Sequence, residues 1–279
     1  MHTVTIALRE FAPEHLDAAL ALSCAAGWPH RREDWAFILS LSTGLVLLDR
    51  ERVIGTALAT PFGDDTAMIN MVLVDERWRG RGLGRQLMTA ALQVVGGREC
   101  RLTATEVGLP LYRALGFHPV GTVTQHQGHA VLTDGEPDGI TWENRAEASI
   151  LANLDREACG MDRKVLIGRL VAAGRVAITS RDGNIAGFAV LRRFGRGEVI
   201  GPVVAKTTED ARALLAFIIA ARRGNFLRVD TSNGTELGSW LSECGLVGVD
   251  TGTLMRRGGH GQQRATSSRT FALASQALG

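Results

Sequence analysis

Residues 74–85 read VDERWRGRGLGR, and this stretch decides the fold. The apolar run at 67–74 before it is typical of a strand, and residues 83–95 after it place apolar side chains on one helical face. Three glycines and three arginines lie between positions 79 and 85. Glycines let a backbone approach an anion closely, and a helix start offers free N–H groups and a positive dipole end. The stretch predicts a strand, a basic loop and a helix suited to a pyrophosphate, with a solvated basic turn as the alternative.

Two common phosphate loops do not fit these residues. A Walker loop needs Lys and then Ser or Thr after its last glycine, whereas Arg85 and Gln86 follow Gly84. A dinucleotide fingerprint needs glycine or alanine at the position of Arg85. These two classes of nucleotide-binding protein are therefore excluded.

The chain on either side of the loop has the pattern of a mixed α/β unit. Alternating or continuous apolar runs predict strands, and apolar side chains at helical spacing predict helices. The expected strands are 4–8, 44–48, 52–58, 67–74, 101–105 and 117–124, and the expected helices are 13–24, 33–41, 83–95 and 109–115.

The second half of the chain repeats the pattern of the first. Residues 53–55, 69–74 and 111–117 have counterparts about 130 residues later, at 185–187, 200–205 and 240–246. Coincidence between two generic α/β patterns is the alternative to a duplication. Residues 128–139, rich in glycine and acidic side chains, are the natural linker, with helices expected at 145–159 and 162–173. We expect a cofactor-binding, catalytic domain at 1–133, a degenerate related domain at 140–258 and a tail at 259–279.

Two motifs resemble the signatures of the GNAT superfamily of N-acetyltransferases. The family's acetyl-CoA loop, Gln/Arg-x-x-Gly-x-Gly/Ala, is matched by Arg79, Gly82 and Gly84, and its Leu-Tyr-x-x-x-Gly-Phe signature by residues 111–117. The resemblance is detailed over residues 1–130 and weaker beyond, as in a two-lobed bacterial subgroup. It implies an α/β (α+β) protein with tandem GNAT folds. Each would be a mixed, mostly antiparallel twisted sheet flanked by helices, with a splayed central strand pair.

The resemblance also implies a set of site residues. Tyr112, the single tyrosine of the chain, would protonate the departing thiolate, with simple packing as its alternative role. Backbone groups of one strand would bind the pantetheine arm and thioester carbonyl of acetyl-CoA, and the loop would hold its pyrophosphate. The strand positions are Met71, Val72, Leu73 and Val74, and the loop positions are Arg79, Gly80, Arg81, Gly82, Leu83, Gly84 and Arg85. Many relatives carry Asn where Thr105 stands, which leaves that cofactor contact unassigned.

No residue identifies itself as the general base for the amine. Asn70 stands where some relatives carry Glu, and an amide cannot take the proton. His30, Asp64, Asp65 and Glu106 are expected near strand ends or the helix loop that faces the acceptor, where capping or solvation is the commoner role. Water relayed to bulk solvent is an equal contender.

The repeated unit has lost this chemistry. Residues 207–212, which replace the loop, contain no glycine and two carboxylates, and these satisfy a helix dipole and repel a pyrophosphate. Leu241 stands at the tyrosine position. We expect one active site per chain, with the second half as a scaffold or a wall of the acceptor pocket. Its polar residues within apolar stretches, which could meet an acceptor or form caps and surface pairs, are Asp155, Asp162, Arg163 and Asp230. The apolar end of the tail, 271–274, is expected to dock.

The net charge, the cysteine pattern and the absence of targeting segments indicate which partners, metal sites and cellular location to expect. Thirty-one Lys and Arg residues against 29 Asp and Glu give a formal net charge of +2, so neither a nucleic acid nor a membrane surface is an expected partner. The four cysteines are scattered singly, which predicts reduced thiols and no metal site. With no signal-peptide pattern or membrane-spanning run, the expected location is the cytoplasm.

The sequence therefore predicts an acetyl-CoA-dependent N-acetyltransferase. It would act on a primary amine of a small molecule or peptide, by direct transfer in a ternary complex, and a homodimer is compatible with these features. The alternative is a regulatory module that binds acetyl-CoA without turnover. Tyr112 and the intact loop favour the enzyme, while the missing base leaves the module open. The acceptor and the acyl-chain preference are not encoded in any motif.

Overall fold

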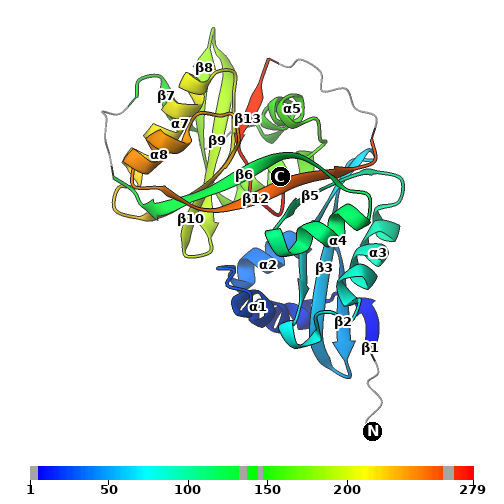
Figure 1. Ribbon diagram of the computed structural model, residues 1–279. Helices are drawn as coiled ribbons and strands as arrows, with labels where there is room; N and C mark the ends of the chain where they lie inside the picture. The colour runs from blue at the N-terminus through cyan, green and yellow to red at the C-terminus, as the bar shows by residue number, and fades with distance from the viewer. Residues whose placement is uncertain (1–5, 132–136, 144–146, 260–266) are drawn as a thin grey trace.

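The computed structural model describes residues 6–131, 137–143, 147–259 and 267–279. The chain forms two α/β halves that share one sheet (Figure 1). The elements of the first half are β1 (Ile6–Glu10), η1 (Pro13–His15), α1 (Leu16–Ala25), α2 (Arg32–Leu39), β2 (Thr43–Asp49), β3 (Arg52–Phe62), β4 (Thr66–Val74), η2 (Glu76–Trp78), α3 (Leu83–Val95), β5 (Glu99–Ala104), η3 (Glu106–Gly108), α4 (Leu109–Ala114) and β6 (His118–His129).

The second half has the same succession of elements and one additional strand at its end. Its elements are β7 (Ile140–Glu143), α5 (Ala148–Cys159), α6 (Lys164–Ala173), β8 (Arg175–Arg181), β9 (Asn184–Phe194), β10 (Gly197–Ala205), α7 (Thr208–Ala221), β11 (Phe226–Ser232), α8 (Gly238–Glu243), β12 (Val247–Arg257) and β13 (Arg269–Ala272). In the described ranges, no helix is long and apolar enough to cross a membrane.

Over the described residues the sheet has 13 strands in the order β1-β2-β3-β4-β5-β12-β6-β11-β13-β10-β9-β8-β7. Among these strands, β4 with β5 and β10 with β11 pair in parallel, and the other pairs are antiparallel. Helices flank both faces of each half, which explains why β3 and β9 are buried along most of their length. The mixed, mostly antiparallel sheet flanked by helices confirms the predicted fold class.

β6, the last strand of the first half, and β12, the strand before β13 in the second half, each pair with strands of the other half. β12 lies between β5 and β6, and β6 lies between β12 and β11. Thus β12 extends the first half beside β5, and β6 extends the second half beside β11. Figure 1 shows these two strands, green and orange, running side by side between the halves. Each half therefore completes its sheet with a strand from the other.

The predicted linker begins too early. Gly128 and His129 belong to β6, where they pair with Leu227 and Phe226 of β11. Gly128 approaches the Gly245 carbonyl so closely that an added Cβ would overlap it, which explains a glycine inside this strand. Residues 4–5 and 145–146, at the starts of a predicted strand and a predicted helix, lie outside the described residues, as do 132–136 within the predicted linker and 260–266 within the predicted tail.

The two parallel strand pairs open in the same way. β4 pairs with β5 only at residues 66–68 and 99–101, and β10 pairs with β11 only at 198–199 and 227–228. In the second half β13 lies in the opening and pairs with both strands. Among the described residues, no strand lies between β4 and β5. The opening in the first half is therefore left without a partner strand.

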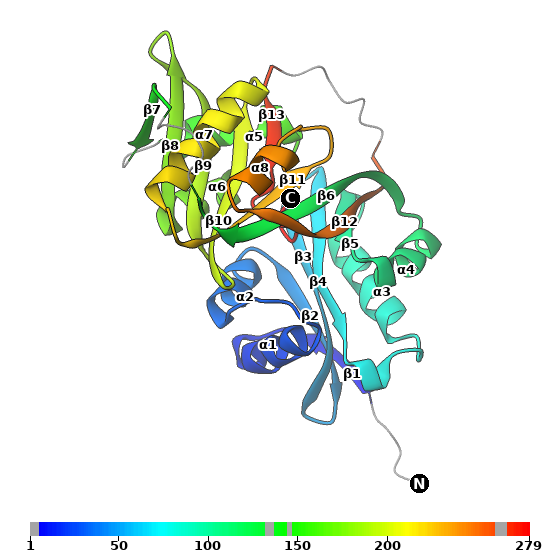
Figure 2. The ribbon, with the colours of Figure 1, turned by 60° about the vertical axis from the view of Figure 1, so that its left-hand side comes forward.

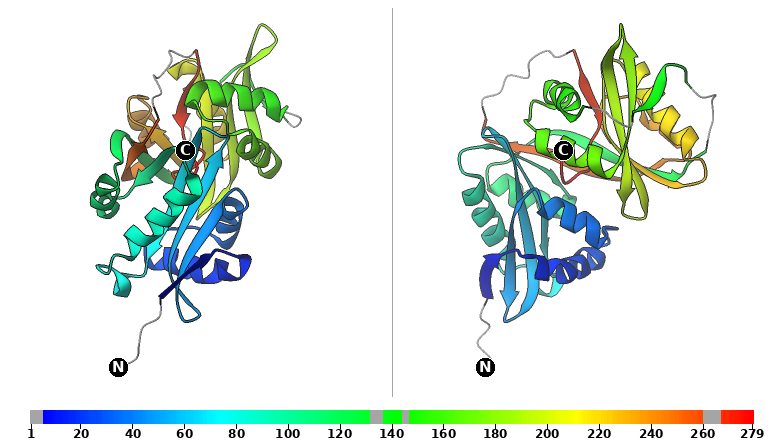
Figure 3. Two further views of the ribbon diagram at one scale, coloured as in Figure 1. Left: turned by 90° about the vertical axis from the view of Figure 1, so that its right-hand side faces the viewer. Right: turned by 180° about the vertical axis from the view of Figure 1, so that it is seen from behind.

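One hydrophobic core joins the halves. α1 and α2 cover one face of the first-half strands and α3 and α4 cover the other, as Figures 1 and 2 show. The α1 and α2 face meets the face of the second half that carries α5, α6 and β13 (Figure 3). Trp35, Met68, Phe188 and Leu278, drawn from both halves, are buried in the same cluster. The α1 and α2 side of the β4–β5 opening is thus the side that faces the second half.

Candidate active site

The middle of β4 carries a bulge. Its pairing with β3 shifts so that Met71 and Val72 both lie opposite Ala57. Met71 has a φ of 50°, in the left-handed region, and its carbonyl accepts a hydrogen bond of 2.7 Å from the hydroxyl of Thr56. Bulges of this kind bend a strand, interrupt its ladder and are common beside active sites. The bulge thus lies in the part of β4 that has no partner on the β5 side.

α3 begins without a side-chain cap. Its N-cap residue, Gly82, has a φ of 77°, and no acidic residue lies in the first turn. A Cβ added at Gly80 or Gly82 would meet nothing within 4 Å, so open space borders the loop there. The first-turn N–H groups consequently have no side-chain partner and lie next to that space. This is the arrangement that binds anionic groups at a helix start.

The arginines of the loop are not neutralised by carboxylates. Arg79, Arg81 and Arg85 are exposed, and none forms an ion pair with a described residue. Arg79 donates from Nε to the Val74 carbonyl at 3.3 Å, and Arg81 stacks on Trp78 at 4.8 Å. The loop therefore presents three positive charges beside the free helix start.

Asp75, just before the loop, has a structural role. Its carboxylate pairs with Arg52 at 2.6 Å and with Arg77 at 3.3 Å, and it accepts the Arg77 N–H as the cap of η2. The hydrogen bonds from Arg77 and the two positive charges lower the pKa of this carboxyl against the effect of burial. Asp75 thus fixes the approach to the loop and is itself fully engaged.

Tyr112 is buried in the second half of α4, beside the loop. The loop and α4 are in contact, since a Cβ added at Gly84 would lie 3.2 Å from the side chain of Leu111, the residue before Tyr112. The ring of Tyr112 packs on Gly108 and edge-on to Phe117, and 8% of the residue is exposed. Its hydroxyl makes no hydrogen bond to any described residue. Burial raises the pKa of Tyr112 to about 12, so the phenol keeps its proton throughout the neutral range.

Most of the candidate bases lie away from the open ends of β4 and β5. Asp64 and Asp65 lie in the turn before β4 and, at a rise of about 3.3 Å per residue, roughly 20 Å from Met71. Glu106 is exposed in η3, directly after β5, and Asn70 is buried next to the bulge with its Oδ1 lacking a hydrogen bond. Of the three carboxylates, Glu106 alone follows the open end of β5, and Asn70, which cannot act as a base, lies beside it on β4.

His30 lies in the connection between α1 and α2, where the halves meet. Its ring is edge-on to Phe194 of β9, at 5.4 Å between centroids. Burial, with the nearby Arg228 second, lowers the pKa of His30 to about 4. A base this weak is poorly matched to an ammonium group, so His30 is not suited to the role of general base.

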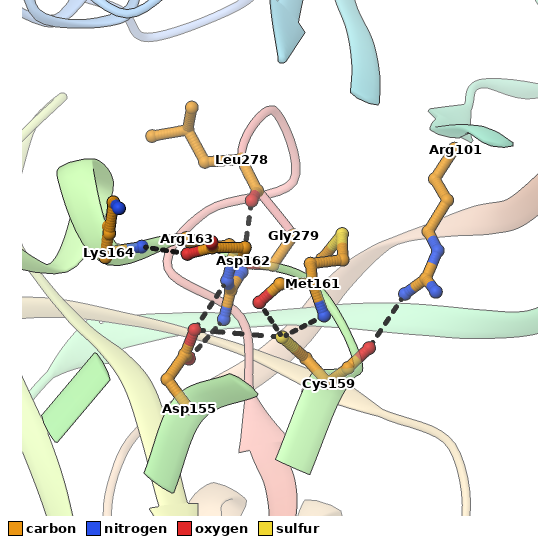
Figure 4. Close-up of polar contacts among 9 residues, drawn as sticks. All are labelled: Arg101, Asp155, Cys159, Met161, Asp162, Arg163, Lys164, Leu278 and Gly279. Carbon is orange, nitrogen blue, oxygen red and sulfur yellow. Dashed lines mark hydrogen bonds and ion pairs between the residues drawn. The ribbon is translucent and has the colours of Figure 1, made fainter. Parts of the chain in front are cut away.

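The tail ends between the halves, held by a buried ion pair (Figure 4). Arg163 donates to Asp155 through two hydrogen bonds, of 2.9 and 2.5 Å, and both side chains are fully buried. Arg163 also donates to the carbonyls of Leu278 and Gly279. The expectation that Asp155 and Arg163 form caps or surface pairs is wrong, because α5, α6 and the tail enclose them.

The rest of the tail contacts the first half. Residues 271–274, expected to dock, form the end of β13 and the start of the following turn. The Thr103 hydroxyl on β5 donates to the Gln276 carbonyl at 2.9 Å, and an added Cβ on Gly279 would be 3.6 Å from the sulfur of Met68 on β4. The tail therefore lies on the α1 and α2 side of β4 and β5.

A cavity of about 1170 Å³ lies elsewhere along the same boundary. Its lining includes Asp65, Thr66, Glu99 and Arg101, from the start of β4 and β5 where the two strands are paired. Neither Tyr112 nor any loop residue from 79 to 85 lines it. The cavity is thus at the closed end of the strand pair and not at the open end.

In the described part of the second half, there is no equivalent of the uncapped loop. Thr207 is the N-cap of α7, and its Oγ1 accepts the Asp210 N–H at 3.1 Å. Asp210 lies in the first turn and pairs with Arg181 at 2.8 Å. Leu241, at the counterpart position of Tyr112, is fully buried. The helix start in this half is satisfied by the chain itself.

These features define a protein of two related α/β units, and comparisons with known proteins agree. Residues 8–118 match the model described as "Acetyltransferase (GNAT) family", and residues 151–271 match "Acetyltransferase (GNAT) domain". An uncharacterised N-acetyltransferase of Bacillus subtilis, YitH, is 30% identical over 95% of this chain and 96% of its own. The chain belongs to the GNAT family and is an N-acetyltransferase.

Two solved structures share the fold of the whole chain. A putative acetyltransferase from Pyrococcus horikoshii superposes with a TM-score of 0.84 over 100% of this chain and 98% of its own, at 17% identity. A tandem GNAT protein from the clavulanic acid biosynthesis pathway superposes with a TM-score of 0.60 over 92% of this chain and 100% of its own, at 15% identity. The tandem arrangement inferred from the repeat is confirmed.

Proposed function

We propose that the chain transfers an acetyl group from acetyl-CoA to a primary amine of a small molecule or peptide. The transfer is direct, within a ternary complex, at one site in the first half. Acetyl-CoA supplies the activated acyl group. The residues of this chain bind it, hold the amine and provide a proton donor for the thiolate that leaves.

The uncapped start of α3 beside the open edge of β4 carries this proposal. A pyrophosphate fits the loop because free N–H groups, a positive dipole end and unpaired arginines converge beside open space at Gly82. The backbone of residues 71–74 offers unpaired groups at the right end of the strand for a pantetheine arm. The pyrophosphate binds Arg79–Arg85, and the pantetheine and thioester bind Met71–Val74.

Tyr112 is the proton donor in this proposal. Its pKa of about 12 keeps the phenol protonated, and its hydroxyl is not engaged with any described residue. A buried hydroxyl of this kind can donate to a developing thiolate at the open end of β4 and β5. Glu106 and water are the remaining routes for the proton of the amine.

The acceptor approaches from the α1 and α2 side. That side faces the second half and is bordered by the tail through Gln276 and by the connection containing His30. The second half thus serves as a wall of the acceptor site, without a cofactor site of its own.

Two measurements test the proposal. A thiol-release assay with acetyl-CoA and a panel of amines, amino acids and peptides should show turnover with at least one amine, while thermal unfolding should show stabilisation by acetyl-CoA. Stabilisation without turnover on any acceptor would favour the regulatory module. Neither stabilisation nor turnover would contradict the assignment of the loop.

A further inference from the structure

A buried polar cluster lies where α2 meets the β9–β10 hairpin. Asp34, at the start of α2, accepts the Gly195 N–H from that hairpin at 2.9 Å. The same carboxylate pairs with Arg31 at 2.7 Å, and only 2% of its side chain is exposed. Asp34 is therefore fully engaged in joining the halves and in neutralising Arg31.

Two arginines of the second half enter the same cluster. Arg228 of β11 binds Asp230 through two hydrogen bonds, of 2.9 and 2.8 Å, so its charge is balanced. Arg192 of β9 is 6% exposed and has no carboxylate within 4 Å in the described part of the chain. Both guanidinium groups lie over the ring of Phe194, at 4.9 Å for Arg192 and 5.2 Å for Arg228.

Arg192 is also incompletely hydrogen-bonded. Its Nη2 donates to the Ala274 carbonyl at 3.1 Å, whereas its buried Nε makes no hydrogen bond to the described residues. The Nδ1 of His30, in the same cluster, likewise has no partner. Buried polar groups are nearly always paired in proteins, so two unpaired ones on residues that both contact Phe194 point to a ligand group.

The charges of the cluster do not cancel. Arg31 and Arg228 are each balanced by an aspartate, and His30 is neutral because its pKa is lowered to about 4. One positive charge, that of Arg192, remains. Burial and the neighbouring Arg228 lower the pKa of Arg192 to about 10, which still leaves it protonated at pH 7.

The cluster lies on the acceptor side of the opening. Arg192 contacts the tail at Ala274, and two residues further on the tail contacts Thr103 of β5. His30 belongs to the connection between α1 and α2, which borders the same face. The same short segment of the tail therefore contacts both this cluster and the face of β5 from which the acceptor approaches in the proposed function.

We propose that Arg192 and His30 bind a carboxylate carried by the acceptor, so that the acceptor is an amino carboxylate. A carboxylate brings one negative charge, which matches the one unbalanced guanidinium, whereas a phosphate monoester brings nearly two. Its oxygens are hydrogen-bond acceptors for the free Nε of Arg192 and for a protonated ring nitrogen of His30. This proposal names the substrate class of the proposed function and rests on it.

The binding test uses carboxylates of known length in the presence of saturating acetyl-CoA. The probes are the ω-amino carboxylates with two to six carbons and the n-alkylamines of the same lengths. At least one amino carboxylate should raise the melting temperature of the wild type by about 2 °C or more, and the matched alkylamine should not. Arg192→Met should remove that shift and retain the shift caused by acetyl-CoA.

The kinetic test uses the same pairs in the thiol-release assay. The amino carboxylate should be the better acceptor by about tenfold or more in kcat/KM, and Arg192→Met should raise its KM by a similar factor. The KM for acetyl-CoA and the activity on the alkylamine should change less than about twofold. Arg193→Met, the same substitution at the exposed neighbour on β9, is the matched control and should keep the wild-type preference.

The outcomes separate this proposal from the proposed function. Turnover without any preference for the amino carboxylate, or a preference unchanged in Arg192→Met, overturns the carboxylate site and leaves the acetyltransferase intact. A carboxylate-dependent shift that Arg192→Met removes supports the site even if none of these amines is acetylated. If Arg192→Met does not fold, Arg192→Gln, which keeps a donor for the Ala274 carbonyl, replaces it.

Discussion

The two halves of the molecule differ most at the opening between their parallel strands. In the first half β4 and β5 diverge with no described strand between them, and α3 begins at an uncapped glycine. In the second half β13 fills the opening, and Thr207 caps α7. Backbone groups in an opened sheet need partners, which either a ligand or the chain itself can supply. The comparison teaches that a segment of the chain's own tail supplies, in the second half, the strand partner that the opening of the first half lacks among the described residues.

The largest expected effect comes from separating the halves. A chain ending at residue 139 lacks β11 and β12, so β5 loses one neighbouring strand and β6 loses both of its neighbours. We expect this fragment to be insoluble or unfolded by circular dichroism. Co-expression with a second chain of residues 140–279 should restore a folded complex. A soluble, cooperatively folding fragment alone would show that the strand exchange is dispensable.

Deletion of residues 268–279 should destabilise the chain without creating a second cofactor site. It removes the buried side chains of Phe271, Leu273 and Leu278, at a cost on the order of 5 kcal/mol in the free energy of unfolding. The start of α7 remains capped by Thr207. Calorimetry should therefore give at most one acetyl-CoA per chain before and after the deletion. Two acetyl-CoA molecules bound to the shortened chain would contradict the account of the second half.

Replacing Gly82 and Gly84 together by valine should abolish stabilisation by acetyl-CoA. Valine resists the positive φ of Gly82, and at Gly84 it would meet Leu111, so the loop could not hold a phosphate. Thermal unfolding with and without acetyl-CoA measures the effect. Gly183→Val, at another exposed position with positive φ, is the control and should keep the full shift. An unchanged shift in the double variant would place the cofactor elsewhere.

Tyr112→Phe should lower kcat by roughly ten- to a thousandfold and leave the affinity for acetyl-CoA nearly unaltered. The hydroxyl acts on the leaving thiolate and not on ground-state binding. Because the pKa of Tyr112 is raised to about 12, the wild type should show no loss of kcat from ionisation of this group below about pH 10. Leu241→Met, at the counterpart position, should leave kcat unchanged. Wild-type turnover in Tyr112→Phe would reduce this residue to packing.

The smallest expected effect is a loss of stability at acidic pH that is caused by His30. Its folded pKa of about 4 is below the ordinary value of 6.5, so the unfolded chain binds the extra proton between those values. Stability from this group is complete above pH 6.5 and is lost as the pH falls toward 4, by about 3 kcal/mol. Urea unfolding between pH 6.5 and 4 should show a shallower decline of the free energy of unfolding for His30→Phe than for the wild type. This variant leaves the neighbouring residues Asp34, Arg192 and Arg228 unchanged. Parallel curves for the two proteins would contradict the assignment.

Local sequence patterns predicted the parts of the molecule that depend on residues close together in the chain. The glycine-rich run 79–85 predicted a loop before the helix, and Gly80 and Gly82 in this loop have φ values of 75° and 77°. The apolar spacing of residues 83–95 gave a helix with those bounds. The loss of the loop and of the tyrosine in the second half also followed from residue types alone. The roles assigned to Tyr112 and the loop remain predictions.

Features that depend on distant pairing were not foreseeable. The order of apolar and polar residues in β6 and β12 does not show that each strand pairs with the other half. A strand that pairs with a distant neighbour and a strand at a free sheet edge can have the same residue pattern. Arg192 stands at the end of an apolar run in β9 and could have been noticed as a charge in a buried strand. Its lack of a carboxylate partner, however, is set by elements from both halves. The sequence offered no signal for that imbalance.

The exchange of β6 and β12 also sets an order for synthesis of the chain. β5 ends at Ala104, and its neighbour β12 starts only at Val247. At a translation rate of about 5–20 residues per second, the edge of β5 waits roughly 10–30 s on the ribosome for that neighbour. Sequence-distant pairing of this kind also slows folding itself. The nascent first half is therefore a candidate for chaperone protection until the last strands emerge, a need that two independently folding domains would not have.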